Sequence, residues 1–153
     1  PLNNIDGVKL FSLQFDTRPR KYGFDMRPGS EGRFDRNAGS EGAIVDLSEG
    51  CEEMKMVDMT TMIQSMEDTC TILAGMDLVI CCDTAISHLA GAMGVPCWMC
   101  LPYNPDWRWG IDGETTCWYD SIKIFRQKER GDWSGVFERV LKELNETLLQ
   151  NKR

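Results

Sequence analysis

The sequence lacks several features that would place it at once in a common class of protein. It has no apolar run near the roughly 20 residues that a membrane span needs, and no basic-then-apolar leader opens it. The dinucleotide fingerprint G-x-G-x-x-G, the phosphate loop G-x-x-x-x-G-K and the nucleophile elbow G-x-S-x-G do not occur. We therefore expect no transmembrane segment, and a dehydrogenase, a P-loop NTPase and a serine hydrolase are disfavoured.

Histidine is also scarce, because His88 is the only one in 153 residues. A Ser-His-Asp hydrolase would have to use it, yet the neighbouring Ser87 cannot face it on a helix. The net charge of −7 disfavours a general nucleic-acid binder. Basic residues do gather within residues 16–42, where they form either a solvated loop or an arm that closes over an anionic ligand.

The cysteines favour a reducing compartment and argue against metal or redox chemistry. There are seven of them, and Cys81 and Cys82 are adjacent, which is unusual for a disulfide framework, so we expect a cytoplasmic protein. Cys97 and Cys100 form a C-x-x-C motif, but on a strand they would point to opposite faces. No second C-x-x-C completes a zinc ribbon. We expect buried free thiols and no metal.

The order of apolar segments predicts an α/β fold. The length suits one domain over residues 1–153, with a long Gly- and Arg-rich loop at 16–42 that is either functional or disordered. Strands are predicted at 8–15, 43–47, 78–82, 95–101 and 121–125, and helices at 60–75, at 84–93 and from Trp133 onward, with Asp132 as N-cap. Residues 48–58 are expected to be irregular. This alternation predicts a Rossmann-like, mostly parallel sheet with helices on both faces.

The junction after the strand at 78–82 is the main candidate site. Ligands of open α/β sheets bind beyond the carboxyl ends of the strands, and a helix N-terminus offers free N–H groups to phosphate. Asp83 could cap the helix within a phosphate site, or it could be an N-cap and nothing more. Thr84 could donate to a phosphate oxygen beside the Ala85 amide. His88 follows Thr84 at i,i+4, either as a ligand or as a satisfied, partly buried histidine. The small residues 90–92 are expected to let the helix pack closely on the sheet.

Two further segments carry candidate residues. In "YNPDWRWG", residues 103–110, an extended chain would place Trp107 and Trp109 on one side. They either pack under the loop or form an aromatic surface for a sugar or base, with Arg108 near phosphate. Gln14, at the end of the first strand, could face the same crevice.

A dense set of motifs carries a resemblance to a known family. Residues 77–133 read "DLVICCDTAISHLAGAMGVPCWMCLPYNPDWRWGIDGETTCWYDSIKIFRQKERGDW". This segment resembles the C-terminal part of glycosyltransferase family 9, which includes the heptosyltransferases, and most of all a bacterial branch often attached to tetratricopeptide repeats. The matching motifs are D-T-x-x-x-H-L-A-G-A, P-D-W-R-W, W-Y, F-R-Q and G-D-W. Upstream, Ser12-Leu13-Gln14 and Asp68-Thr69 are also similar.

The resemblance implies a function as well as a fold. It implies the C-terminal half of a GT-B glycosyltransferase, a Rossmann-like domain that binds a nucleotide diphosphate sugar over the start of the D-T-x-x-x-H helix. It also implies sugar transfer without a metal or other cofactor, in which the helix and its donors stabilise the leaving diphosphate. Relatives often carry a lysine soon after S-L-Q, where this sequence has Phe15. Arg18, Arg20 or Lys21 would then take its place, or the site is weakened.

The same resemblance leaves the activity of the chain open. Because the sequence starts at Pro1, we expect a processed product or a piece of a longer protein, and the resemblance implies that the acceptor-binding N-terminal domain of a GT-B enzyme is missing from it. We therefore expect a donor-binding half that is not active alone and that works with that domain or with a tetratricopeptide-repeat region. Self-association into a homodimer is a further expectation. The alternative is a non-catalytic nucleotide- or sugar-binding or protein-interaction module that retains only the fold.

Overall fold

The computed structural model describes residue 5 and the ranges 7–13 and 56–151. The chain divides into two compact units, one of residues 8–63 and the other of residues 1–7 together with 64–153. The loop expected at 16–42, the strand expected at 43–47, Gln14 and Arg18 lie outside the described residues. The assignment of residues 1–153 to one domain stays a prediction.

The unit of residues 8–63 contains a two-stranded parallel sheet. Strand β1, Leu10–Ser12, pairs with β2, Met56–Asp58, in the register Phe11 to Val57. The backbone N–H of Met59 continues the pairing by donating to the carbonyl of Ser12. The prediction that residues 48–58 are irregular is therefore wrong for Met56–Asp58. Three residues are too short for a readable alternation, and pairing with β1 decides their conformation.

The larger unit is built on a three-stranded parallel sheet. Its strands are β3, Val79–Cys81, β4, Cys97–Leu101, and β5, Ile122–Arg126, in the order β3-β4-β5. All five residues of the central β4 are buried, whereas β3 is buried at Val79 and half-buried beyond it. Parallel strands joined through helices confirm the Rossmann-like α/β class.

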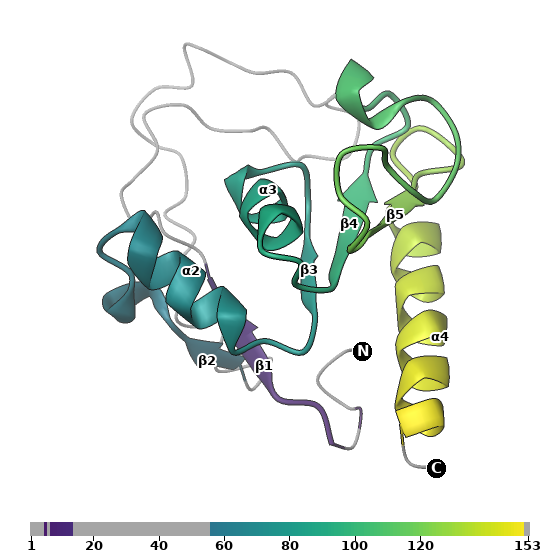
Figure 1. Ribbon diagram of the computed structural model, residues 1–153. Coiled ribbons are helices and arrows are strands. Elements are labelled where there is room, and N and C mark those ends of the chain that lie inside the picture. Colours follow the sequence, from purple (N-terminus) through teal and green to yellow (C-terminus); the bar gives the residue numbers. More distant parts are fainter. Residues whose placement is uncertain (1–4, 6, 14–55, 152–153) are drawn as a thin grey trace, which may run out of the picture. The chain divides into compact units, whose positions relative to one another are not determined.

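Helices cover both faces of this sheet (Figure 1). Helix α3, Ala85–Ala92, packs against β3 and β4, and α4, Ser134–Asn151, packs against β5. On the α4 side, the helix residues Val136, Val140 and Leu144 pack against Trp98, Cys100 and Phe125 of the strands. The amphipathic pattern of residues 133–148 thus predicts the buried face of α4 correctly.

Local hydrogen bonds determine where two of the helices begin. Helix α2, Met66–Ala74, starts at a capping box in which Ser65 accepts from the amide of Asp68, and the Asp68 carboxylate accepts from the amide of Ser65. The helix expected from Thr60 therefore begins later, and Thr60–Met62 forms a short 3-10 turn, η2. At α4, the Asp132 carboxylate accepts from the amide of Gly135 at 3.0 Å, as expected of a cap.

No helix among the described residues combines the length and the apolar character that crossing a bilayer requires. The cytoplasmic location and the homodimer stay predictions.

Candidate functional site

The junction between β3 and α3 leaves the first amides of the helix open. Thr84 is the N-cap residue, in an extended conformation, and its side chain makes no capping hydrogen bond. Its hydroxyl contacts the carbonyl of Cys82 at 3.5 Å instead. The amides of Ala85 and Ile86 have no partner inside the helix, since the first intrahelical bond runs from Ser87 to Thr84. Thr84 and Ala85 are exposed, so this end of the helix can accept an anion.

Asp83 does not cap this helix, contrary to the expectation from the sequence, because Thr84 is the N-cap residue. Its carboxylate lies on the side of His88, with Oδ1 4.0 Å from Nε2 of the imidazole. Because His88 follows Asp83 by five residues, the contact spans the first turn and a half of α3. Asp83 thus lies beside the histidine, beyond hydrogen-bond distance, and does not occupy the helix amides.

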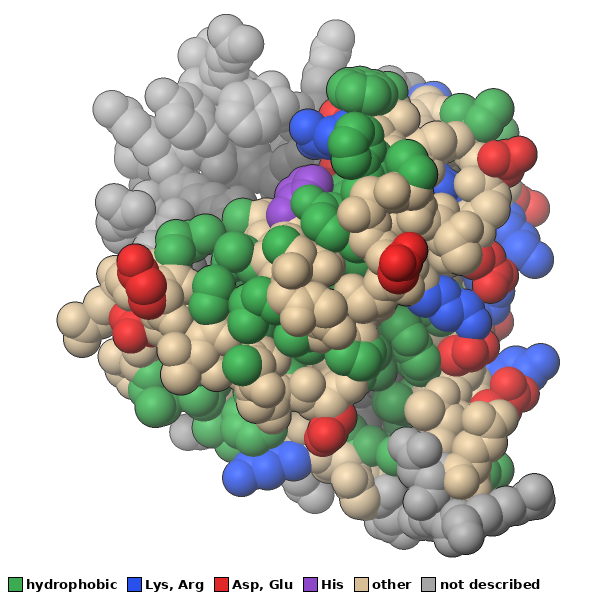
Figure 2. All heavy atoms as spheres, in the orientation of Figure 1, with side chains coloured by type: hydrophobic (Ala, Val, Ile, Leu, Met, Phe, Trp, Pro, Cys, Tyr) green, Lys and Arg blue, Asp and Glu red, His purple; other side chains and the backbone are tan. Residues whose placement is uncertain are grey.

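His88 is fixed by aromatic residues from the loop between β4 and β5. Its Nδ1 lies 3.1 Å from the hydroxyl of Tyr119, and the Tyr119 ring meets it edge-on at 5.8 Å between centroids. The indole of Trp109 lies at 5.2 Å from the imidazole between ring centroids, with a tilt of 33°. The imidazole stays 37% exposed, and in Figure 2 this purple side chain reaches the surface beside hydrophobic and basic side chains. The result is a held but accessible imidazole one turn after Thr84.

Gly91 explains how Tyr119 comes so close to the helix. A Cβ atom on Gly91 would lie 2.4 Å from Cγ of Tyr119, a distance that real side chains do not reach. The ring therefore lies directly on the helix backbone, one turn beyond His88. The expectation that small residues let α3 pack on the sheet holds for the fully buried Ala90. Gly91 instead makes room for the ring of Tyr119.

The loop of residues 102–121 contains the short 3-10 helix η3, Trp107–Trp109. A 3-10 turn has three residues, so the side chains at 107 and 109 point in different directions. Trp109 is 3% exposed and lies against His88, whereas Trp107 is 78% exposed. The prediction that both indoles lie on one side is therefore wrong. Nε1 of Trp109 is buried and has no hydrogen-bond partner in the part of the chain that the structure describes.

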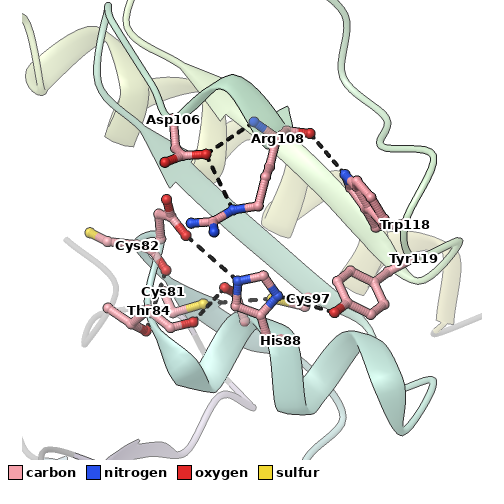
Figure 3. Close-up of polar contacts among 11 residues, drawn as sticks. Cys81, Cys82, Thr84, His88, Cys97, Asp106, Arg108, Trp118 and Tyr119 are labelled. Atoms are coloured by element: carbon pink, nitrogen blue, oxygen red, sulfur yellow. Dashed lines mark hydrogen bonds and ion pairs between the residues drawn. The ribbon is translucent and has the colours of Figure 1, made fainter. Parts of the chain in front are cut away.

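Arg108 belongs to the same loop and is engaged by Asp106. Its Nε lies 3.2 Å from Oδ1 of Asp106, and its backbone N–H donates to the same oxygen. Its carbonyl accepts from the indole N–H of Trp118 at 3.0 Å. In Figure 3 the guanidinium points to the side of the loop on which His88 lies. One nitrogen of Arg108 is thus already paired with Asp106.

Two consecutive residues at the end of β5 hold this loop in shape. Arg126 donates to the carbonyls of Gly113 and Gly110 at 3.0 and 3.1 Å and also to the carbonyl of Trp109. Burial lowers the pKa of its guanidinium. Gln127 accepts from the amides of Tyr103 and Gly131. Arg126 and Gln127 of the F-R-Q motif therefore hold parts of the loop that carries Trp109 and Tyr119.

The two cysteines of the C-x-x-C motif have separate environments. No group of three or more His, Cys, Asp or Glu side chains in the described part of the chain is placed to hold a metal ion. Cys100 belongs to the cluster that faces α4, whereas Cys97 lies 3.6 Å from Cys81 on the neighbouring strand. The hydrogen bond between these two thiols raises the pKa of Cys81. Cys97 and Cys100 therefore face opposite sides of the sheet and form no C-x-x-C pair.

A surface groove lies at the other end of α3 and is lined by residues 91–94 and 118–121. That end of the helix presents carbonyl oxygens and the negative end of the helix dipole. It is therefore the wrong end of α3 for an anion, and the candidate anion site remains at Thr84.

Comparison with known proteins bears directly on this site. Residues 37–98 match the sequence model of glycosyltransferase family 9 (heptosyltransferase). The match covers less than half of the chain, and it includes β3, α3 and the beginning of β4. No curated protein and no solved structure gives a significant match. The segment that contains Asp83, Thr84, Ala85 and His88 is thus the one that is similar to the family.

The structure brings together most of the described candidate residues. Asp83, Thr84, Ala85 and His88 share the junction after β3, and Arg108 follows the buried strand β4. The W-Y and F-R-Q motifs contain Tyr119 and Arg126, but the sequence assigned neither residue a role at the site. The close packing expected at Gly91 is present, with Tyr119 as the neighbour in place of the sheet.

Proposed function

We propose that this chain is the nucleotide-sugar-binding domain of a glycosyltransferase with GT-B architecture, and that the start of α3 holds the diphosphate of the donor. The observation that carries the proposal is the exposed helix start, where the amides of Ala85 and Ile86 are not capped by the Thr84 hydroxyl and have no partner among the described residues. This helix start lies within the segment that matches glycosyltransferase family 9. The position beyond the carboxyl end of a parallel strand is the usual ligand site of such sheets.

The proposed chemistry is sugar transfer without a metal ion, in which the protein stabilises the departing nucleoside diphosphate. Negative charge grows on the diphosphate as the bond to the sugar breaks. The amides at the helix start and the helix dipole are already directed at that charge, and so act without reorganisation. The hydroxyl of Thr84 and an N–H of His88 supply two further donors. Removal of one such preorganised donor typically costs about 3 kcal/mol of transition-state stabilisation.

The acidic neighbours have defined roles in this proposal. The Asp83 carboxylate lies 4.0 Å from Nε2 of His88, and Asp106 holds Arg108 through Nε. The guanidinium of Arg108 retains nitrogens with which to contact a phosphate oxygen.

A thermal-shift panel of ADP-, GDP-, UDP- and CMP-linked sugars tests the proposal. A donor present at 100 times its dissociation constant stabilises the folded protein by about 2.7 kcal/mol. For a chain of this size that corresponds to a rise in Tm of about 5–10 °C. A well-folded sample that responds to no member of the panel would favour the alternative, a module that keeps the fold for another kind of interaction.

Thr84→Val tests the position of the site. This variant keeps the shape of the side chain and removes the hydroxyl, so we expect weaker binding with unchanged stability of the free protein. The matched control is Thr71→Val, which makes the same change at an exposed position of α2. Equal affinity of the parent and Thr84→Val would remove the assignment of this hydroxyl to the site.

A further inference from the structure

The imidazole of His88 is held on two sides by residues that follow it in the chain by more than 20 positions. Tyr119 places its hydroxyl 3.1 Å from Nδ1, and Trp109 covers the ring at 5.2 Å between centroids. The remaining ring nitrogen, Nε2, faces Asp83 at 4.0 Å. Tyr119 thus restrains the edge of the ring and Trp109 its face, while the Asp83 carboxylate lies on the side of Nε2 beyond hydrogen-bond distance.

We infer that Tyr119 is a positioning residue that keeps His88 in one tautomer, with the proton on Nε2. A neutral imidazole has one donor and one acceptor nitrogen, and the partner of one nitrogen decides which is which. The Tyr119 hydroxyl can donate to Nδ1, while the Asp83 carboxylate on the other side attracts an N–H. Both neighbours therefore favour a proton on Nε2. In that state the imidazole presents a donor on the side of the helix start.

The packing around Tyr119 serves this contact. A ring can lie on α3 one turn beyond His88 only because position 91 has no side chain. The second restraint, Trp109, is tied to the sheet because its carbonyl accepts from Arg126. Tyr119 itself is half-buried, and its ring contacts backbone at Gly91 and side chain at His88. The packing of the Tyr119 ring thus directs its hydroxyl at Nδ1 of His88. A phenylalanine at position 119 would keep this packing and lose only the hydroxyl.

This inference rests on the proposed function for the ligand, since an Nε2–H is useful only if an anionic oxygen binds beside it. The state of the imidazole, however, is measurable without any ligand. Two measurements therefore separate the failure of the inference from the failure of the proposed function.

The first measurement is the nitrogen-15 spectrum of the imidazole, which is unambiguous because the chain has one histidine. At a pH where the ring is neutral, the parent should show an unprotonated Nδ1 and a protonated Nε2. Tyr119→Phe should shift the Nδ1 resonance and populate the Nδ1-protonated tautomer. The matched control Tyr103→Phe, at an exposed position, should leave both resonances in place. A protonated Nδ1 in the parent, or identical spectra of the parent and Tyr119→Phe, would overturn the inference.

The second measurement is a double-mutant cycle read out by calorimetric titration with inorganic pyrophosphate. Tyr119→Phe should weaken binding by about 2- to 10-fold, the effect of one neutral hydrogen bond. In a His88→Ala background the same change should have no effect, because Tyr119 acts through the imidazole. An equal loss in both backgrounds would show that Tyr119 acts independently of His88 and would refute the positioning role. A parent that does not bind pyrophosphate would refute the proposed diphosphate site, while the nitrogen spectra would still decide the role of Tyr119.

Discussion

Gly91→Ala is the substitution whose cost the structure defines most sharply. The added Cβ would lie 2.4 Å from Cγ, 2.8 Å from Cδ1 and 2.9 Å from Cβ of Tyr119. These atoms are close to the Tyr119 backbone, so the ring cannot swing away without movement of its loop. Overpacking of this kind costs about 1–3 kcal/mol, and three such contacts place it in the upper part of that range. The higher helix propensity of alanine compared with glycine offsets about 1 kcal/mol of this cost. We expect a net loss of about 1–2 kcal/mol in the free energy of unfolding.

Urea unfolding followed by circular dichroism measures this loss. The matched control is Gly75→Ala at the end of α2, where φ is −92° and the nearest atom to a new Cβ is a carbonyl oxygen at 3.5 Å. That variant should be neutral, or more stable by up to about 1 kcal/mol. In a Tyr119→Ala background the Gly91→Ala change should no longer destabilise. If Gly91→Ala alone is as stable as the parent, the ring of Tyr119 does not lie on the helix, and the account of how His88 is held is wrong.

Three further predictions concern the rest of the larger unit. Arg126→Lys should destabilise the protein by about 1–3 kcal/mol and speed hydrogen exchange in the loop at 109–113, because a lysine cannot bond three carbonyls at once. Unchanged exchange would show that the hydrogen bonds of Arg126 do not hold this loop. Hydrogen bonds from Gln64 and Ser65 lower the pKa of Asp68 from its ordinary value of 3.8. The stability difference between the parent and Asp68→Asn should therefore be complete at neutral pH and fade as the pH falls below about 4, and a difference that does not vary with pH would contradict this. Burial raises the pKa of Cys100 to about 12, so its thiol should react with a thiol reagent only after unfolding, unlike the exposed thiols of Cys82 and Cys117.

Much of the larger unit could be predicted because its signals are local. The continuous apolar run at 95–101 marks the buried strand β4, and the one-sided pattern after Trp133 marks α4. The boundaries were less accurate where a hydrogen bond decides them. Helix α2 begins at the capping box of Ser65 and Asp68, which lies inside the longer helical pattern of residues 60–75. Strand β2 depends on pairing with residues more than 40 positions away, which no local pattern reports.

The candidate site was predictable in part for a similar reason. A strand that ends just before a helix is visible in the sequence, so Thr84 and His88 were found. The contacts of His88 with Trp109 and Tyr119 depend on the path of a 20-residue loop, and the sequence does not specify that path. The two tryptophans show the difference most clearly: alternation assumes an extended chain, whereas the 3-10 turn buries Trp109 and exposes Trp107.

The most direct test of the central claim is to map the backbone amides of nitrogen-15-labelled protein during titration with inorganic pyrophosphate. If the start of α3 holds a diphosphate, the amides of Ala85 and Ile86 should shift with saturation, and Thr84→Val should weaken the response. If these two amides stay unperturbed while pyrophosphate shifts others, or if nothing shifts at all, α3 does not carry the site.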